Sequence, residues 1–102
     1  MFKLIKRLFS PKIDFAKLVQ EGALIVDVRT IEEYGAGHLD TSRNIPLDQI
    51  KNEINTLKKS GKPVITVCRS GNRSGIAKSI LKSAGVEAYN GGAWTNLKKQ
   101  IQ

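Results

Sequence analysis

The clearest indication of the fold is the stretch Pro63-Val-Ile-Thr-Val-Cys-Arg-Ser-Gly-Asn-Arg-Ser74. Residues 63–67 form a short apolar run, which is typical of a strand buried on both faces in a parallel sheet. The residues after Cys68 are polar or small and include a glycine, so they predict a loop. Beyond the loop, apolar residues recur on one face of a helix that Gly85 ends: Ile76, Ala77, Ile80, Leu81 and Ala84.

Strands and helices alternate on both sides of this stretch. Residues 24–28 form a second apolar run and predict a second buried strand. Asp14 is suited to cap a helix that ends at Gly22, and Thr30 with Glu33 three residues later forms a capping-box pattern. Further elements are expected as an extended piece at 44–47, a helix at 48–59, a strand at 86–89, a turn at 90–92 and a helix at 93–101. This alternation predicts an α/β fold with a parallel sheet.

Length and composition are those of one ordinary globular domain. The chain has 102 residues, of which 40% are hydrophobic and 25% charged, and these values exclude disordered and low-complexity classes. Lysine and arginine outnumber aspartate and glutamate by 17 to 9, for a net charge of +8. This balance indicates either a well-solvated basic surface or an anionic partner. The few aromatic residues are not interleaved with the lysines, so we expect no nucleic-acid partner.

The first nine residues differ from the rest of the chain. Phe2, Ile5 and Phe9 recur at helical spacing with basic residues between them. We expect an amphipathic arm over residues 1–11, packed on or frayed from a domain at 12–102, with contact between residues 1–9 and acidic lipid as the alternative. The arm is too charged for a signal peptide, and no apolar run is long enough to span a bilayer, so we expect a cytoplasmic protein.

Cys68 is the candidate nucleophile of the chain. It is the only cysteine and His38 the only histidine, which excludes an internal disulfide and argues against a zinc site. A lone cysteine is often a small buried hydrophobe. Here, however, backbone N–H groups of the loop, the start of the following helix, and Arg69 and Arg73 would all favour thiolate over thiol. We therefore expect a nucleophilic Cys68 with a lowered pKa.

Three blocks, in this order, resemble a single-domain rhodanese of the sulfurtransferase family. The first contains Leu24-Ile-Val-Asp-Val-Arg29, Glu32-Glu33-Tyr34, Gly37-His38 and Asn44-Ile45-Pro46. The second is Cys68-Arg-Ser-Gly-Asn-Arg-Ser74, which is similar to the family's active-site loop. The third is Tyr89-Asn-Gly-Gly92 with Trp94. The resemblance covers the chain from about residue 14 to residue 101 and implies a small five-stranded parallel sheet with helices on both faces.

The resemblance also implies a reaction. Cys68 would take a sulfane sulfur from a small anionic donor such as thiosulfate, hold it as a persulfide, and pass it to a thiophilic acceptor such as cyanide or a thiol. Since the chain has no second cysteine, the acceptor must be an external thiol or a protein partner. No metal and no organic cofactor is implied.

Six loop residues are expected to bind the substrate: Arg69, Ser70, Gly71, Asn72, Arg73 and Ser74. Backbone amides of the loop would surround the sulfur, while the two arginines would attract or orient the donor. Four residues separate Cys68 from Arg73. Relatives that act as phosphatases or arsenate reductases have a loop one residue longer, so the resemblance favours sulfur over a tetrahedral oxyanion.

Three further residues are expected to support the site. Asp27 and Arg29 end a strand near the edge where Cys68 lies, and they would either orient the loop or form an internal ion pair. His38 would be structural, with general-base catalysis as its alternative. Two other functions remain open for the chain: a non-catalytic or sulfur-carrier module that docks a protein partner, and a cysteine-dependent phosphatase or arsenate reductase.

Overall fold

The structure is a computed structural model that describes residues 12–102, so the predicted arm lies outside the described residues. One parallel sheet has the strand order β2-β1-β3-β4. Its strands are β1 (Leu24–Asp27), β2 (Arg43–Asn44), β3 (Val64–Cys68) and β4 (Ala88–Ala93). The α/β class with a parallel sheet is confirmed. The fifth strand that the resemblance implied is wrong for residues 12–102, where four strands make up the sheet. The segments between and before these strands are helix or loop, so none of them pairs with an edge of the sheet.

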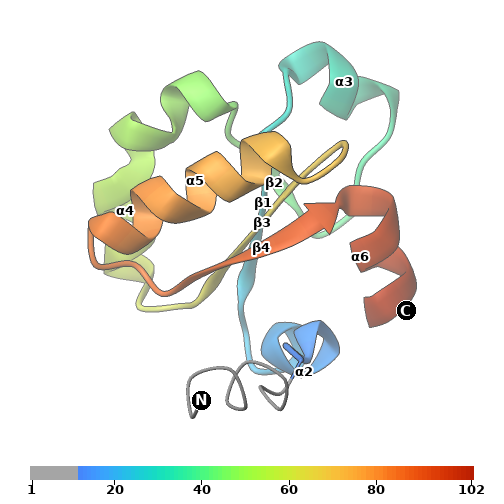
Figure 1. Cartoon of the computed structure of the whole chain (residues 1–102), viewed down its shortest axis with the longest axis horizontal. Helices are drawn as coiled ribbons and strands as arrows, with labels where there is room; N and C mark the ends of the chain where they lie inside the picture. Colours follow the sequence, from blue (N-terminus) through green and yellow to red (C-terminus); the bar gives the residue numbers. More distant parts are fainter. Residues whose placement is uncertain (1–11) are drawn as a thin grey trace, which may run out of the picture.

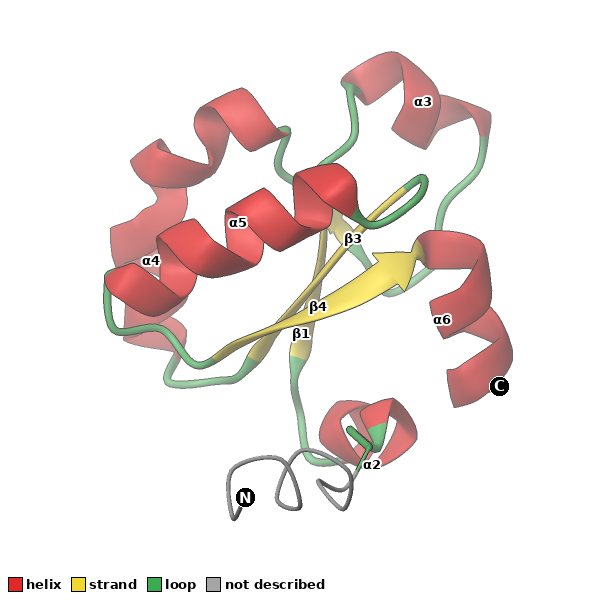
Figure 2. Ribbon diagram, viewed as in Figure 1, coloured by secondary structure: helices red, strands yellow, loops and turns green. Residues whose placement is uncertain are grey.

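Within residues 12–102, six helical segments connect and flank the strands, as Figures 1 and 2 show. They are α2 (Phe15–Gln20), α3 (Ile31–Ala36), the 3-10 helix η1 (Leu47–Glu53), α4 (Ile54–Ser60), α5 (Asn72–Ser83) and α6 (Trp94–Ile101). The predicted caps are present: Asp14 accepts a hydrogen bond from the Lys17 N–H, and Thr30 and Glu33 cap α3 reciprocally. None of the helices in the described part of the chain is long and apolar enough to cross a membrane.

Helices cover both faces of the sheet, because alternate residues of each strand point to opposite sides. In β3, Val64 and Cys68 join a cluster with residues of η1, α4 and α5. Ile65 and Val67 join a second cluster with residues of α2 and α6. All four side chains are at most 1% exposed. The expectation of a doubly buried central strand is confirmed, and Cys68 ends that strand.

Two local expectations are wrong. The helix expected at 48–59 is divided into η1 and α4. Leu47 and Ile50 are three residues apart, which matches the 3-10 period, and the Gln49 N–H bonds to the Pro46 carbonyl at 2.8 Å. On α5, Ile76 does not share the buried face of its neighbours but is 53% exposed.

The turn expected at 90–92 is also wrong, because these residues continue β4 beside β3. Asn90 pairs with Thr66 and Ala93 with Cys68, so β4 carries one extra residue in a bulge. Glycine is required at Gly91, where a Cβ atom would lie 2.8 Å from the Ile65 side chain. Strand β4 accommodates Gly91 and Gly92 because, at Gly91, its backbone lies directly against β3, where a side chain would not fit.

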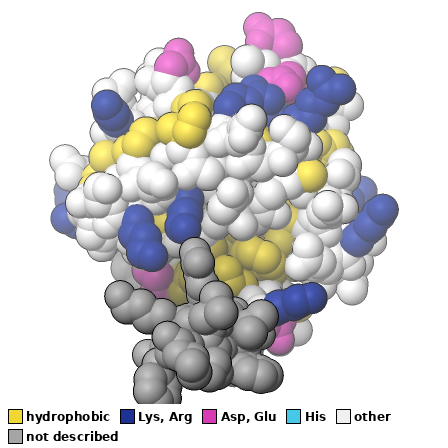
Figure 3. All heavy atoms as spheres, in the orientation of Figure 1, with side chains coloured by type: hydrophobic (Ala, Val, Ile, Leu, Met, Phe, Trp, Pro, Cys, Tyr) yellow, Lys and Arg dark blue, Asp and Glu magenta, His cyan; other side chains and the backbone are white. Residues whose placement is uncertain are grey.

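The basic residues do not form one cluster on the face seen in Figure 3. Lysine and arginine side chains are spread around its edge and centre, and several lie beside acidic ones. On this face the positive balance of the chain is that of a solvated surface.

Candidate functional site

Cys68 lies where β3 gives way to the loop before α5. Gly71 has φ of +105°, a left-handed conformation that glycine adopts without strain. This conformation turns the Gly71 N–H back onto the Cys68 Sγ, at 2.9 Å. The strand positions the sulfur, and the glycine turn places a donor on it.

The surroundings of Cys68 favour its thiolate. Burial alone raises the pKa of the thiol, but hydrogen bonds outweigh this effect and leave the pKa below its ordinary value. The Ser74 side chain makes the strongest of these bonds, followed by the N–H groups of Ser74, Gly71 and Ser70. The expected lowering thus comes chiefly from hydrogen-bond donors at the start of α5.

The side chains of Ser74 and Asn90 extend this network, a role that no pattern in the sequence indicates. The Ser74 hydroxyl lies 3.2 Å from the Cys68 Sγ and 2.7 Å from the Asn90 Oδ1. Asn90 also donates to the Gly71 carbonyl at 3.1 Å. Ser74 had been noted only for its backbone, and the pairing of β4 with β3 brings Asn90 here.

A hydroxyl has one proton to donate, so the network has two states. With a thiol, the S–H donates to the Ser74 oxygen and the Ser74 hydroxyl donates to Asn90. With a thiolate, the Ser74 hydroxyl turns to the sulfur. Asn90 Oδ1 then keeps the Gly92 N–H, which lies 2.9 Å away. Loss of the thiol proton therefore leaves neither the Cys68 sulfur nor the Asn90 Oδ1 without a donor.

Arg73 is bound to Glu33 of α3. Its guanidinium reaches the two carboxylate oxygens at 2.6 and 3.0 Å. The hydrogen bond from Arg73, together with one from the Thr30 N–H, lowers the pKa of Glu33 to about 2. Arg73 therefore borders the loop, but its fork of donors faces a carboxylate of the same chain.

Asp27 and Arg29 form a buried ion pair, with the closest N···O distance 2.8 Å. Arg29 also donates to the Gly37 carbonyl at 2.7 Å, and its guanidinium lies 5.0 Å from the centre of the Trp94 ring. It thereby joins the end of β1 to α3 and α6. The arrangement is that of an internal ion pair, and it holds α3 beside the loop.

His38 makes its contacts with Tyr34 of α3. A ring nitrogen lies 2.8 Å from the Tyr34 carbonyl oxygen, and the two rings stack at 3.8 Å between centroids. These contacts stabilise the end of α3 and support the structural interpretation of His38.

An open cavity of about 520 Å³ adjoins the loop. It is lined by Arg29, Glu33, Ala36, Arg69, Trp94 and Thr95. The Arg69 guanidinium makes no hydrogen bond to residues 12–102, whereas Arg29 and Arg73 are each bound to a carboxylate. Among these three arginines, Arg69 presents the uncommitted charge to the cavity.

The chain matches a known protein family. Residues 12–97 match the Rhodanese-like domain family, so this chain belongs to that family. The uncharacterized protein YqhL of Bacillus subtilis is 41% identical over 69 residues, which are 67% of this chain and 54% of YqhL. The thiosulfate sulfurtransferase PspE of Escherichia coli is 38% identical over 61 residues, 59% of each protein. The chain therefore matches little more than half the length of these curated relatives.

A solved structure shows the same fold. It is described as a rhodanese with anions from E. coli and superposes with a TM-score of 0.67 at 31% identity. The match covers 74% of this chain and 91% of that one. The class of protein implied by the three sequence blocks is thus confirmed, while the roles of individual site residues stay predictions.

Proposed function

We propose that this protein is a sulfurtransferase that carries sulfur on Cys68 as a persulfide. The 2.9 Å contact between the Gly71 N–H and the Cys68 sulfur carries the proposal. Together with the lowered pKa of the thiol, this contact favours the thiolate of Cys68 at the end of a strand. Membership of the rhodanese-like family supports the same chemistry.

The reaction balances without a cofactor. The Cys68 thiolate attacks the outer sulfur of thiosulfate, the S–S bond of the donor breaks, and sulfite leaves with the bonding electron pair. An external thiolate then attacks the outer sulfur of the Cys68 persulfide, which forms a new persulfide and returns Cys68 as a thiolate. The loop N–H groups stabilise the negative sulfur in both states.

A sulfur-carrier role is the second candidate. The cavity beside the loop is open and, at about 520 Å³, is larger than a small inorganic anion requires. It would therefore admit the end of a protein acceptor as well as a small thiol. Phosphatase or arsenate reductase chemistry is less well supported, because Glu33 occupies the guanidinium fork that would bind the oxyanion.

Mass spectrometry tests the proposal. Incubation with thiosulfate should add one sulfur, about 32 Da, to Cys68 through nucleophilic substitution at sulfur. Dithiothreitol should remove it, and Cys68→Ser should take up none. Sulfur transfer by the serine variant would contradict the mechanism, whereas uptake without turnover to cyanide or thiols would favour the carrier role.

A further inference from the structure

Glu33 makes two sets of contacts that join α3 to the loop. Its carboxylate accepts hydrogen bonds from the Thr30 N–H and hydroxyl, both at 3.1 Å, in the capping box of α3. The same carboxylate faces Arg73 through both of its oxygens. The helix that presents Glu33 is itself held by Arg29, which reaches the Glu33 and Gly37 carbonyls.

The geometry of this pair is that of a bound oxyanion. Two parallel N–H···O bonds from a guanidinium are the arrangement by which arginine binds carboxylate, sulfate or phosphate groups. Here the chain supplies the anion itself. Glu33 also lines the cavity beside the loop, so its negative charge faces any anion that enters there.

We propose that Glu33 is a specificity-determining residue: it withholds Arg73 from bound anions and so lowers the affinity of the Cys68 loop for small tetrahedral dianions. The low pKa of Glu33, about 2, means that the carboxylate stays charged at working pH. A dianion in the cavity then meets the uncommitted guanidinium of Arg69, while the guanidinium of Arg73 beside it stays bound to Glu33. This inference deepens the proposed function, on which its donor preference rests: the site suits a donor with less negative charge than thiosulfate, such as an organic persulfide.

Glu33→Gln is the sharpest test. Glutamine keeps the capping box, because its side-chain oxygen also accepts the Thr30 N–H, but it removes the charge that binds Arg73. The matched control is Glu32→Gln, which removes a neighbouring exposed charge of the same helix. Circular dichroism would verify that both variants are folded.

Two measurements follow. Phosphate should protect Cys68 from alkylation by iodoacetamide, and its apparent Kd should fall roughly three- to tenfold in Glu33→Gln. The KM for thiosulfate should fall by a similar factor with little change in kcat. The control should leave both values near those of the wild type. Damage to the fold would weaken binding, so a gain in affinity separates this role from a merely structural one.

The double variant Glu33→Gln/Arg73→Gln should lose the gain, since the released guanidinium is its source. Glu33→Asp, with a shorter reach to Arg73, should fall between the wild type and Glu33→Gln and serves as the test if the glutamine variant does not fold. Unchanged phosphate affinity in folded Glu33→Gln, or an equal gain in Glu32→Gln, would overturn the proposal. The phosphate assay requires no sulfur transfer, so failure of the proposed function would appear only in the thiosulfate assay.

Discussion

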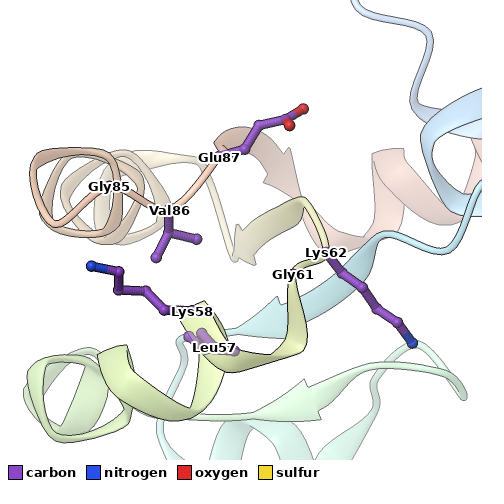
Figure 4. A pocket seen from close by; sticks show the side chains of 7 residues that line it. All are labelled: Leu57, Lys58, Gly61, Lys62, Gly85, Val86 and Glu87. Atoms are coloured by element: carbon purple, nitrogen blue, oxygen red, sulfur yellow. The ribbon is translucent and has the colours of Figure 1, made fainter.

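The two ends of the β3–α5 unit have opposite electrostatic characters. At the carboxyl end of β3, the start of α5 turns N–H groups toward the Cys68 sulfur. At the other end, a cavity of about 210 Å³ lies between the ends of α4 and α5, where helix carbonyls point outward. Figure 4 shows Lys58 extending on the Gly85 side of this second cavity, while Lys62 and Glu87 point away.

This electrostatic difference between the two ends explains why a nucleophile is favoured at one edge of a parallel sheet. Parallel strands place the beginnings of the following helices at one edge of the sheet, so partial positive charge gathers there. The opposite edge gathers partial negative charge, which a lysine near the helix ends complements. A thiolate is therefore stabilised at Cys68, where N–H groups face the sulfur, and the helix ends at the second cavity offer no such donors to an anion. The following predictions test this contrast.

The largest expected effect on sulfur uptake comes from a change in the size of the Cys68 loop. A glycine inserted between Asn72 and Arg73 should lower sulfur uptake from thiosulfate by roughly 10²- to 10³-fold, because it moves N–H donors away from the sulfur. A glycine inserted between Gly61 and Lys62, at the opposite end, should leave uptake near the wild-type rate. Stopped-flow measurement of sulfite release compares the two. Equal rates in folded variants would show that loop size does not govern the chemistry.

A smaller effect is expected for the hydroxyl beside the sulfur. Ser74→Ala removes the strongest hydrogen bond that lowers the pKa of Cys68, so that pKa should rise. The pH profile of iodoacetamide alkylation should then shift to higher pH, with a slower rate at neutral pH because less thiolate is present.

Ser60→Ala is the matched control for this change. The Ser60 hydroxyl bonds to the Leu57 carbonyl near the end of α4, at the opposite edge of the sheet. Its removal should leave the alkylation profile of Cys68 in place. A profile of Ser74→Ala that coincides with the wild type would refute the role of the hydroxyl.

The smallest expected effect is on the KM for thiosulfate, when a positively charged side chain is removed. Arg69→Ala should raise the KM for thiosulfate about threefold, because it removes the uncommitted guanidinium of the cavity, whereas Lys58→Ala should leave it unchanged. The KM should also rise with NaCl, since salt screens charges over roughly 8 Å at physiological ionic strength. Steady-state kinetics at low and high salt measure both. A KM that does not change with NaCl and is equal in both variants would show that the basic residues take no part in substrate binding.

Much of the fold follows from local patterns. The strands β1 and β3 are short, mainly apolar runs, and the caps of α2 and α3 lie directly before the helices they begin. Such signals involve neighbours along the chain and can be recognised without tertiary contacts. The candidate nucleophile belongs to the same category, because a cysteine between a buried strand and a helix start is visible in the sequence.

The remaining features depend on residues far apart in the chain. The sequence Asn90-Gly-Gly92 is typical of turns and predicts one, whereas the pairing of β4 with β3 places Asn90 beside Ser74. Arg73 was expected to orient the donor, but a charge forty positions away binds its guanidinium. No local pattern indicates such a partner, since it depends on how Arg29 holds α3 against the sheet.

The α/β class, the place of Cys68 at the end of a strand and the family resemblance could all be inferred from the amino-acid sequence, because apolar periodicity, caps and the loop motif are local properties. Which charges stay free around Cys68 depends instead on tertiary packing. A hydrogen bond or ion pair needs its two groups within about 3 to 4 Å, and only the packed sheet and helices bring Glu33 and Asn90 to the loop.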